Sequence, residues 1–171
     1  MRTGSGMKKP EKSLRIFSDT SALFSALHSN SGGSRELLIL AEFGIVEIRL
    51  SRRVLGEIDR VLEKKYPKGK PLLAFILQQS RIQVVDDADE AEIEMYREIT
   101  GHLQDAAILA EAVKSGCDAL VTYDRNHLLT ERVKQVVPLF IGTAGDVIQH
   151  FFSSKAFLKP YDEPPAPDSD H

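Results

Sequence analysis

The chain has 171 residues and carries 22 Lys and Arg against 25 Asp and Glu, which gives a formal net charge of −3. This balance excludes a protein that coats nucleic acid by bulk electrostatics, although it allows a local basic groove. Hydrophobic residues make up 42% of the chain, and Cys117 is its single cysteine. No apolar run approaches the ~20 residues of a membrane span. We therefore expect one globular domain in a reducing cytoplasm, with no membrane segment and no internal disulfide.

The first part of the chain is predicted to be a strand followed by two helices. The strand lies at residues 14–17, and Asp19 separates it from the helical segment ALFSAL. A Ser- and Gly-rich turn follows. Ser34 is then a candidate N-cap for a second helix, and Gly44 fits the position just after that helix ends.

The helix after the second strand, which is predicted at 45–50, carries an acid close to its apolar stripe. Ser51 is its candidate N-cap, and apolar residues recur at helical spacing through VLGEIDRVL. Glu57 falls on or beside that stripe, about 9 Å along the helix from the carboxyl end of the strand at 1.5 Å per residue. A Glu side chain that points back toward the helix N-terminus can reach the edge of the sheet.

The middle of the chain continues this alternation. After a Pro- and Gly-rich break, residues 71–79 predict another helix and residues 81–85 a third strand. Residues 86–94 hold six acids ahead of a helix that ends near Thr100. We interpret these acids as solvated residues that complement the helix dipole, not as a catalytic group.

The most informative stretch is QDAAILAEAVKSGCDALVTYD, at 104–124. It predicts a helix, a tight turn and a short strand at 119–122, with an acid at each end. If the strand joins a parallel sheet, the helix before it runs antiparallel to it. Asp105 and Asp124 are then neighbours at the carboxyl edge of the sheet, where open α/β sheets bind their ligands.

The remaining residues complete a parallel α/β fold. After a short polar turn or helix, a strand is predicted at 136–141, and Thr143 caps a last helix. The order β-α-α-β-α-α-β-α-α-β-(α)-β-α predicts a three-layer α/β/α sandwich with a central parallel sheet. We expect this domain to span 13–153, after a loose arm or added leader at 1–12 and before a disordered, acidic, Pro-rich tail at 154–171.

Four acids are expected to converge at the carboxyl edge, namely Asp19, Glu57, Asp105 and Asp124. Carboxylates that crowd together raise one another's pKa and destabilise the fold unless a cation neutralises them. Hard oxygen ligands without a Cys or His cluster favour Mg²⁺ or Mn²⁺ over zinc. Such an ion suits phosphate chemistry, because it orients a phosphodiester and activates a water molecule.

The motifs that hold these acids resemble the PIN domain family of metal-dependent nucleases. They are DTSAL at Asp19, the acid within VLGEIDRVL, DAAILAEA from Asp105 and VTYDRNHL around Asp124. The likeness covers nearly the whole domain and is greatest to VapC-like toxins of bacterial toxin–antitoxin pairs. It implies a ribonuclease, commonly homodimeric, whose four acids hold Mg²⁺ or Mn²⁺ and whose antitoxin blocks the site. It also implies that Ser21 supports the first acid and that Asn126 takes an auxiliary polar position after the last.

Two positions depart from the toxin-like members. Another acid often precedes the third motif there, where this chain has His102, Leu103 and Gln104, and Asn126 stands where some members keep an acid. Fewer carboxylates weaken a second metal site. The alternative is therefore a PIN-like scaffold that binds RNA or a protein with little or no cleavage. A receiver-like phosphorylation domain fits less well, because it needs paired acids after the first strand and a Lys at a later strand end.

Each acid also has an ordinary structural interpretation. Asp19 and Asp105 can be helix N-caps, Asp124 a turn residue, and Glu57 the partner of Arg53 one turn earlier. The convergence of all four at one edge favours the metal site over these separate accounts.

Other polar residues are assigned by position. Three basic residues near the predicted edge can steer an RNA backbone, namely Arg52, Arg53 and Arg125. Two hydroxyls are expected to pack or cap at strand ends, not to bind an ion, namely Thr20 and Thr122. Of these two, Thr122 is expected to support the acids. Four histidines are expected at the surface, namely His28, His102, His127 and His150.

Overall fold

The structure is a computed structural model that describes residues 12–79 and 82–153. Their strands form one five-stranded, all-parallel sheet in the order β3-β2-β1-β4-β5. β1 lies at the centre and pairs with both β2 and β4. The strands are β1 (Leu14–Ser18), β2 (Val46–Ser51), β3 (Ile82–Val85), β4 (Ala119–Val121) and β5 (Phe140–Gly142).

Helices connect the strands in the order that the sequence predicts, with two helices in each of the first three connections. The helices are α1 (Thr20–His28), α2 (Gly33–Glu42), α3 (Arg52–Lys65), the 3-10 turn η1 (Pro67–Gly69), α4 (Lys70–Gln79), α5 (Glu90–Thr100), α6 (Leu103–Lys114), α7 (Glu131–Val136) and α8 (Ala144–Phe152). Within the described ranges, none of these helices is long and apolar enough to cross a membrane.

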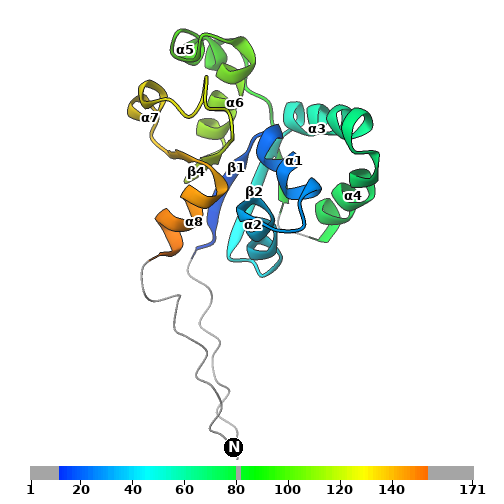
Figure 1. Ribbon diagram of the computed structural model, residues 1–171. Helices are drawn as coiled ribbons and strands as arrows, with labels where there is room; N and C mark the ends of the chain where they lie inside the picture. Colours follow the sequence, from blue (N-terminus) through cyan, green and yellow to red (C-terminus); the bar gives the residue numbers. More distant parts are fainter. Residues whose placement is uncertain (1–11, 80–81, 154–171) are drawn as a thin grey trace, which may run out of the picture.

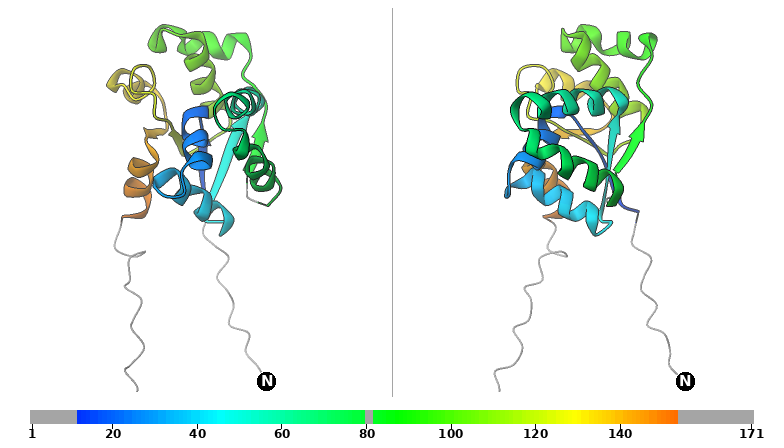
Figure 2. Two further views of the ribbon diagram at one scale, coloured as in Figure 1. Left: turned by 45° about the vertical axis from the view of Figure 1, so that its right-hand side comes forward. Right: turned by 90° about the vertical axis from the view of Figure 1, so that its right-hand side faces the viewer.

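The helices cover both faces of the sheet. α1 to α4 gather on the right of Figure 1, whereas α5, α6 and α7 lie at its upper left. Because parallel crossovers are right-handed, connections that run in opposite directions along the sheet place their helices on opposite faces. Figure 2 shows α3 and α4 alongside β2 and β3, which they contact. The predicted α/β/α sandwich with a central parallel sheet is therefore confirmed.

Several helix ends use the residues that the sequence suggests. Ser51 caps α3 and accepts a hydrogen bond from the N–H of Val54 at 3.2 Å. Thr143 and Asp146 form a reciprocal capping box at the start of α8. Gly44 follows α2 with a φ of 71°, a conformation that favours glycine, so the predicted stop is confirmed.

Two local predictions are wrong. Ser34 does not cap α2, because the helix begins two residues earlier than predicted, with Gly32 in the N-cap position. The strand predicted at 136–141 is shorter and begins later, at Phe140. Thr130 caps α7 through the N–H of Val133, and this short helix takes up Val136 before the chain turns into β5.

Some predictions fall on residues that the structure does not describe. They concern most of the arm at 1–12, Arg81 at the start of the third strand, and the tail at 154–171. The domain bounds therefore stay a prediction.

The buried core fixes the point of the sheet at which β1 and β4 end side by side. Phe17 of β1 and Leu120 of β4 are fully buried, and these two strands are neighbours. β1 continues to β2 on one side, whereas β4 arrives on its other side, so the strand order reverses between β1 and β4. Ser18 pairs with Val121 where both strands end. A crevice outside the carboxyl ends of two such strands is the usual ligand site of an open α/β sheet.

Candidate active site at the carboxyl edge of the sheet

Asp19 lies at the point where the strand order reverses. Its N–H donates to the carbonyl of Val121 at 3.1 Å, which extends the pairing of β1 and β4 by one step. Its carboxylate accepts from the N–H of Ala22 at 2.9 Å, so it caps α1, and from the hydroxyl of Ser21 at 2.7 Å. The hydroxyl of Thr122 donates to its other oxygen. The capping role and a role in a site are thus compatible, and Ser21 and Thr122 support this acid as the sequence suggests.

Ionisation of the Asp19 carboxyl group carries a cost that a nearby cation would offset. It is 6% exposed, and burial raises its pKa, against the opposing effect of the hydrogen bonds from Thr122, Ala22 and Ser21. The nearby charge of Asp124 raises the pKa further. A carboxylate offers about four acceptor positions, and these three donors leave one of them free.

Asp124 forms a turn directly after β4. Its Oδ1 accepts from the N–H groups of Asn126 at 2.9 Å and His127 at 3.0 Å, and its Oδ2 lies 3.1 Å from Nδ1 of His127. Burial opposes ionisation of this carboxyl, but the hydrogen bonds from His127 and Asn126 outweigh it and lower the pKa of Asp124. Asp124 is therefore a fixed negative charge at this edge.

Asp105 lies in the first turn of α6 and does not cap that helix. The N-cap position belongs to His102, whose side chain makes no capping hydrogen bond. Burial raises the pKa of Asp105, and the charge of Asp124 raises it further, against a smaller opposing effect of His127. The side chain is 19% exposed, and its Oδ2 lies 3.5 Å from Nδ1 of His127. The predicted neighbourhood of Asp105 and Asp124 is therefore present, with His127 between them.

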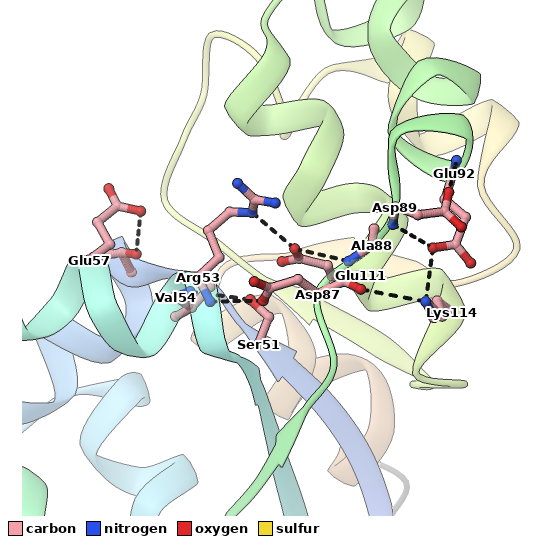
Figure 3. Close-up of polar contacts among 11 residues, drawn as sticks. Ser51, Arg53, Val54, Glu57, Asp87, Ala88, Asp89, Glu92, Glu111 and Lys114 are labelled. Carbon is pink, nitrogen blue, oxygen red and sulfur yellow. Dashed lines mark hydrogen bonds and ion pairs between the residues drawn. The ribbon is translucent and has the colours of Figure 1, made fainter.

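Glu57 reaches the same edge from α3. Its Oε2 accepts from the hydroxyl of Thr20 at 2.9 Å, directly after Asp19 in the chain. The alternative pairing of Glu57 with Arg53 does not occur, because the Nε of Arg53 instead donates to Glu111 at 3.0 Å. Figure 3 shows Glu57 on α3, apart from the Arg53–Glu111 pair. Thr20 thus contacts one of the four acids, beyond the packing role expected from the sequence.

A cavity of about 880 Å³ joins these residues, and all four predicted acids line it. Arg53 and Arg60 of α3 also line the cavity. They are seven residues apart, so they lie on the same face of the helix. Arg52 instead forms an exposed ion pair with Asp86 at 3.5 Å, and neither it nor Arg125 lines the cavity. Arg60 was missed in the sequence, although its helical spacing from Arg53 and Glu57 was available as a signal.

A buried carboxylate fixes the direction of Arg53. Glu111 of α6 is 1% exposed, and its Oε1 accepts from Nε of Arg53 and, at 3.3 Å, from the N–H of Ala88. Figure 3 shows this pair bridging α3 and α6, with the terminal nitrogens of Arg53 directed away from Glu111. Glu111 was also missed, because an acid in an Ala-rich helix gives no sign of which residue it faces.

The sequence placed His102 and His127 at the surface, and His102 is exposed while His127 is 33% exposed, but nothing in the sequence indicated that the two lie together. Their rings meet edge to face with centroids 4.1 Å apart, and both line the cavity. Among the described residues, one group of at least three His, Cys, Asp or Glu has ligand atoms that all lie within 4.8 Å of one another, namely His102, Asp105 and His127. The premise that the site lacks a histidine cluster is therefore corrected. The cluster forms between residues 25 positions apart, which no local pattern reveals.

The residues present fit a divalent cation. Asp19 and Asp105 have raised pKa values, caused first by burial and then by the charge of Asp124, so the metal-free site carries a repulsion that a cation would relieve. Asp124 is held in its charged form. Carboxylate oxygens suit Mg²⁺ and Mn²⁺, whereas imidazole nitrogens suit later transition metals.

A family model for the PIN domain matches residues 15–126, which is more than half of the chain and contains all four acids. The chain belongs to the PIN domain family. PIN domains are generally nucleases, and they typically depend on a divalent metal. The comparison with curated proteins gives no match.

Solved structures support the PIN fold. The VapBC2 structure from Rickettsia felis, bound to a DNA fragment from its promoter, aligns with a TM-score of 0.52 and 19% identity, over 76% of this chain and 98% of that one. PAE2754 from Pyrobaculum aerophilum aligns with a TM-score of 0.56 and 17% identity, over 88% of this chain and 97% of that one. At these identities the likeness concerns the fold.

The raised pKa of Asp105 predicts a pH-dependent stability difference. A carboxyl whose folded pKa lies above its unfolded value of 3.8 contributes stability at low pH that is lost as the pH rises through the folded pKa. We expect the Asp105→Asn variant to gain melting temperature relative to the unsubstituted chain between about pH 4 and pH 7, because the amide cannot ionise. Thermal melts of both metal-free proteins at each pH measure this difference, and a difference that stays constant or shrinks contradicts the expectation.

Proposed function

We propose that this PIN domain is a metal-dependent endoribonuclease that hydrolyses phosphodiester bonds in RNA. The observation that carries the proposal is the single cavity lined by Asp19, Glu57, Asp105 and Asp124 together with two arginines. Carboxylates and arginines that line one cavity suit a metal ion and a phosphate side by side. The family match supports the same class of reaction.

The four acids would hold Mg²⁺ or Mn²⁺. Such an ion supplies a Lewis acid that orients the phosphodiester, lowers the pKa of a bound water and stabilises the leaving oxygen. The chain's own residues fix the geometry around it. Ser21, Ala22 and Thr122 hold the Asp19 carboxylate in one orientation, and the turn after β4 holds Asp124.

Arg53 is the basic residue best placed to bind the RNA backbone. Its Nε is committed to Glu111, which leaves the two terminal nitrogens of the planar fork for a phosphate. Arg60 supports it from the next turns of α3. The exposed Arg52 and Arg125 would add weaker attraction at the rim.

We propose a cytoplasmic toxin with an antitoxin as its protein partner, and a homodimer as its assembly. The relative from Rickettsia felis is a VapBC pair, and this suggests an antitoxin for the present chain. Leu103 lines the cavity and is 58% exposed, so a segment that covers the cavity would bury it. Such a partner would block access of RNA to the acids.

RNA cleavage with and without metal tests the proposed reaction. We expect the full-length chain to cleave single-stranded RNA with Mn²⁺ and to lose this activity in excess EDTA. Glu57→Gln should reduce cleavage strongly, because it removes a charge at the cavity, whereas Glu98→Gln should not, since Glu98 is 95% exposed and outside the cavity. Cleavage that persists in EDTA would refute the metal mechanism. No cleavage of any RNA with Mg²⁺ or Mn²⁺ would favour the alternative, a PIN scaffold that binds without cleaving.

A further inference from the structure

His102 and His127 form part of a cluster that the carboxylate site does not require. His102 stands in the N-cap position of α6, where its carbonyl accepts from the N–H of Ala106 at 2.9 Å and from the hydroxyl of Thr100 at 3.0 Å. His127 follows the turn after β4. The tertiary fold thus brings two imidazoles from separate elements to the same side of Asp105.

The spacing of the three side chains suits one small ion. Adjacent donors around a tetrahedral metal with 2.0–2.1 Å bonds lie about 3.4 Å apart. One ligand atom from each of the three residues lies within 4.8 Å of the other two, which is farther apart than the donors around a bound ion. Small side-chain rotations bring such a set to bonding distance. The ring of His102 packs against His127 but makes no hydrogen bond to any described residue, so a rotation of this ring breaks none.

Asp124 orients His127 in the way that metal-binding histidines are commonly oriented. Its Oδ2 lies 3.1 Å from Nδ1, while the other ring nitrogen has no hydrogen-bond partner among the described residues. A carboxylate behind a histidine fixes the ring and raises the basicity of the ligating nitrogen. Asp124 thus has a second role here beside its place among the four acids.

The chemistry of this ligand set selects a different class of metal from the one implied by carboxylates alone. Imidazole nitrogen suits Zn²⁺, Co²⁺ and Ni²⁺, whereas Mg²⁺ prefers oxygen and retains its waters. His102 is exposed and His127 is 33% exposed, so an ion can enter and keep a solvent ligand in the open position. Three protein ligands with one open position is the usual arrangement of a catalytic, not a structural, zinc site.

We propose that His102, Asp105 and His127 bind one borderline transition-metal ion, represented by Zn²⁺ or Co²⁺, more tightly than Mg²⁺. The site shares Asp105 with the proposed nuclease centre, but the binding itself does not depend on RNA cleavage. It would fill the position next to the third motif where toxin-like relatives often carry an additional acid.

Titration of the metal-free, full-length chain with Co²⁺ tests this site. We expect one Co²⁺ per chain, visible absorption typical of low-coordinate cobalt, and displacement by Zn²⁺ but not by an equal concentration of Mg²⁺. His102→Ala should weaken Co²⁺ binding by at least about tenfold, since even residues behind the ligands commonly cost 10–100-fold in metal affinity. His127→Ala should weaken it similarly. Because His102 is exposed, its loss should leave the melting temperature of the metal-free protein nearly unchanged.

A matched control isolates the two cluster histidines. The chain has five histidines, and replacing His28, His150 and His171 together by Gln leaves only His102 and His127. This control should bind Co²⁺ as the unsubstituted chain does. Equal Co²⁺ affinity in His102→Ala and the unsubstituted chain, or affinity for Mg²⁺ as high as for Co²⁺, would overturn the proposal.

A further comparison separates this inference from the proposed nuclease. Glu57→Gln is expected to lose RNA cleavage and to keep its Co²⁺ affinity, because Glu57 lies outside the cluster. A chain that binds Co²⁺ through the two histidines but never cleaves RNA would refute the nuclease alone. A chain that cleaves RNA with Mg²⁺ but shows no histidine-dependent Co²⁺ binding would refute the cluster alone.

Discussion

Asp19→Asn is expected to lower the rate of RNA cleavage at least about 100-fold, because loss of residues that only support metal ligands already costs 10–100-fold. Asp19 is the most enclosed of the four acids and stands where the strand order reverses. An amide keeps the size of the side chain but removes the negative charge that the proposed cation needs. The readout is the initial rate of cleavage of a single-stranded RNA at saturating Mn²⁺.

The fold of this variant should survive. Asn is as good an N-cap as Asp, so it can still accept from the N–H of Ala22 at the start of α1. The substitution also replaces a carboxyl group whose pKa is raised by burial, so the cost of burying a negative charge disappears. This gain in stability offsets the loss of the hydrogen bond from Thr122. We therefore expect a cooperative thermal transition within a few degrees of that of the unsubstituted chain.

Asp86→Asn is the matched control, since Asp86 pairs with Arg52 at the surface and its side chain is 79% exposed. This control should retain full activity. If Asp19→Asn instead cleaves RNA at the rate of the control while remaining folded, the assignment of Asp19 to the metal site is wrong.

Arg53→Ala is expected to destabilise the fold by about 2–3 kcal/mol. Removal of one partner of a buried ion pair commonly costs about 3–5 kcal/mol, because the remaining charge is buried without compensation. The Glu111 side chain is fully enclosed, and its Oε2 has no hydrogen-bond partner among the described residues. We expect a smaller loss than this general range because the Arg53 side chain is 39% exposed. Water can therefore partly take the place of the guanidinium group beside Glu111.

Thermal and urea unfolding measure this effect. At about 2–4 °C per kcal/mol for a domain of this size, the melting temperature should fall by about 4–12 °C. Arg52→Ala is the neighbouring control, and its surface pair with Asp86 should contribute less than about 1 kcal/mol. Equal effects of the two substitutions would contradict the buried-charge argument.

A second substitution tests whether the unpaired charge of Glu111 causes the loss of stability. Glu111→Gln placed on the Arg53→Ala background should recover part of the lost stability, because a neutral amide carries a smaller desolvation cost than a carboxylate. Its carbonyl can still accept from the N–H of Ala88. If the double variant recovers no stability, the loss in Arg53→Ala comes instead from the packing of the aliphatic part of the Arg53 side chain.

The position of a site residue could be predicted from the sequence where it depends only on the place of that residue in its own helix or strand. Asp19 and Asp124 follow directly after β1 and β4, so the parallel pairing of these strands places them at one edge. Asp105 lies in the first turn of the helix that leads into β4, and its position follows from the length of that helix. The direction in which Glu57 points, toward Thr20, depends on the packing of α1 against α3 and was open in the sequence.

The sequence by itself determined the order of elements, the parallel sandwich, the capping residues of α3 and α8, and the edge at which the acids collect. These features depend on hydrophobic periodicity, on local hydrogen bonding and on the handedness of crossovers, which are properties of short segments. Only the tertiary structure decided that Arg53 faces Glu111 and not Glu57, and that His102 and His127 meet beside Asp105. Such contacts join side chains from different elements, so they depend on how helices rotate and pack on the sheet. The chemistry of the site, oxygen ligands alone or oxygen with nitrogen, depends on that packing.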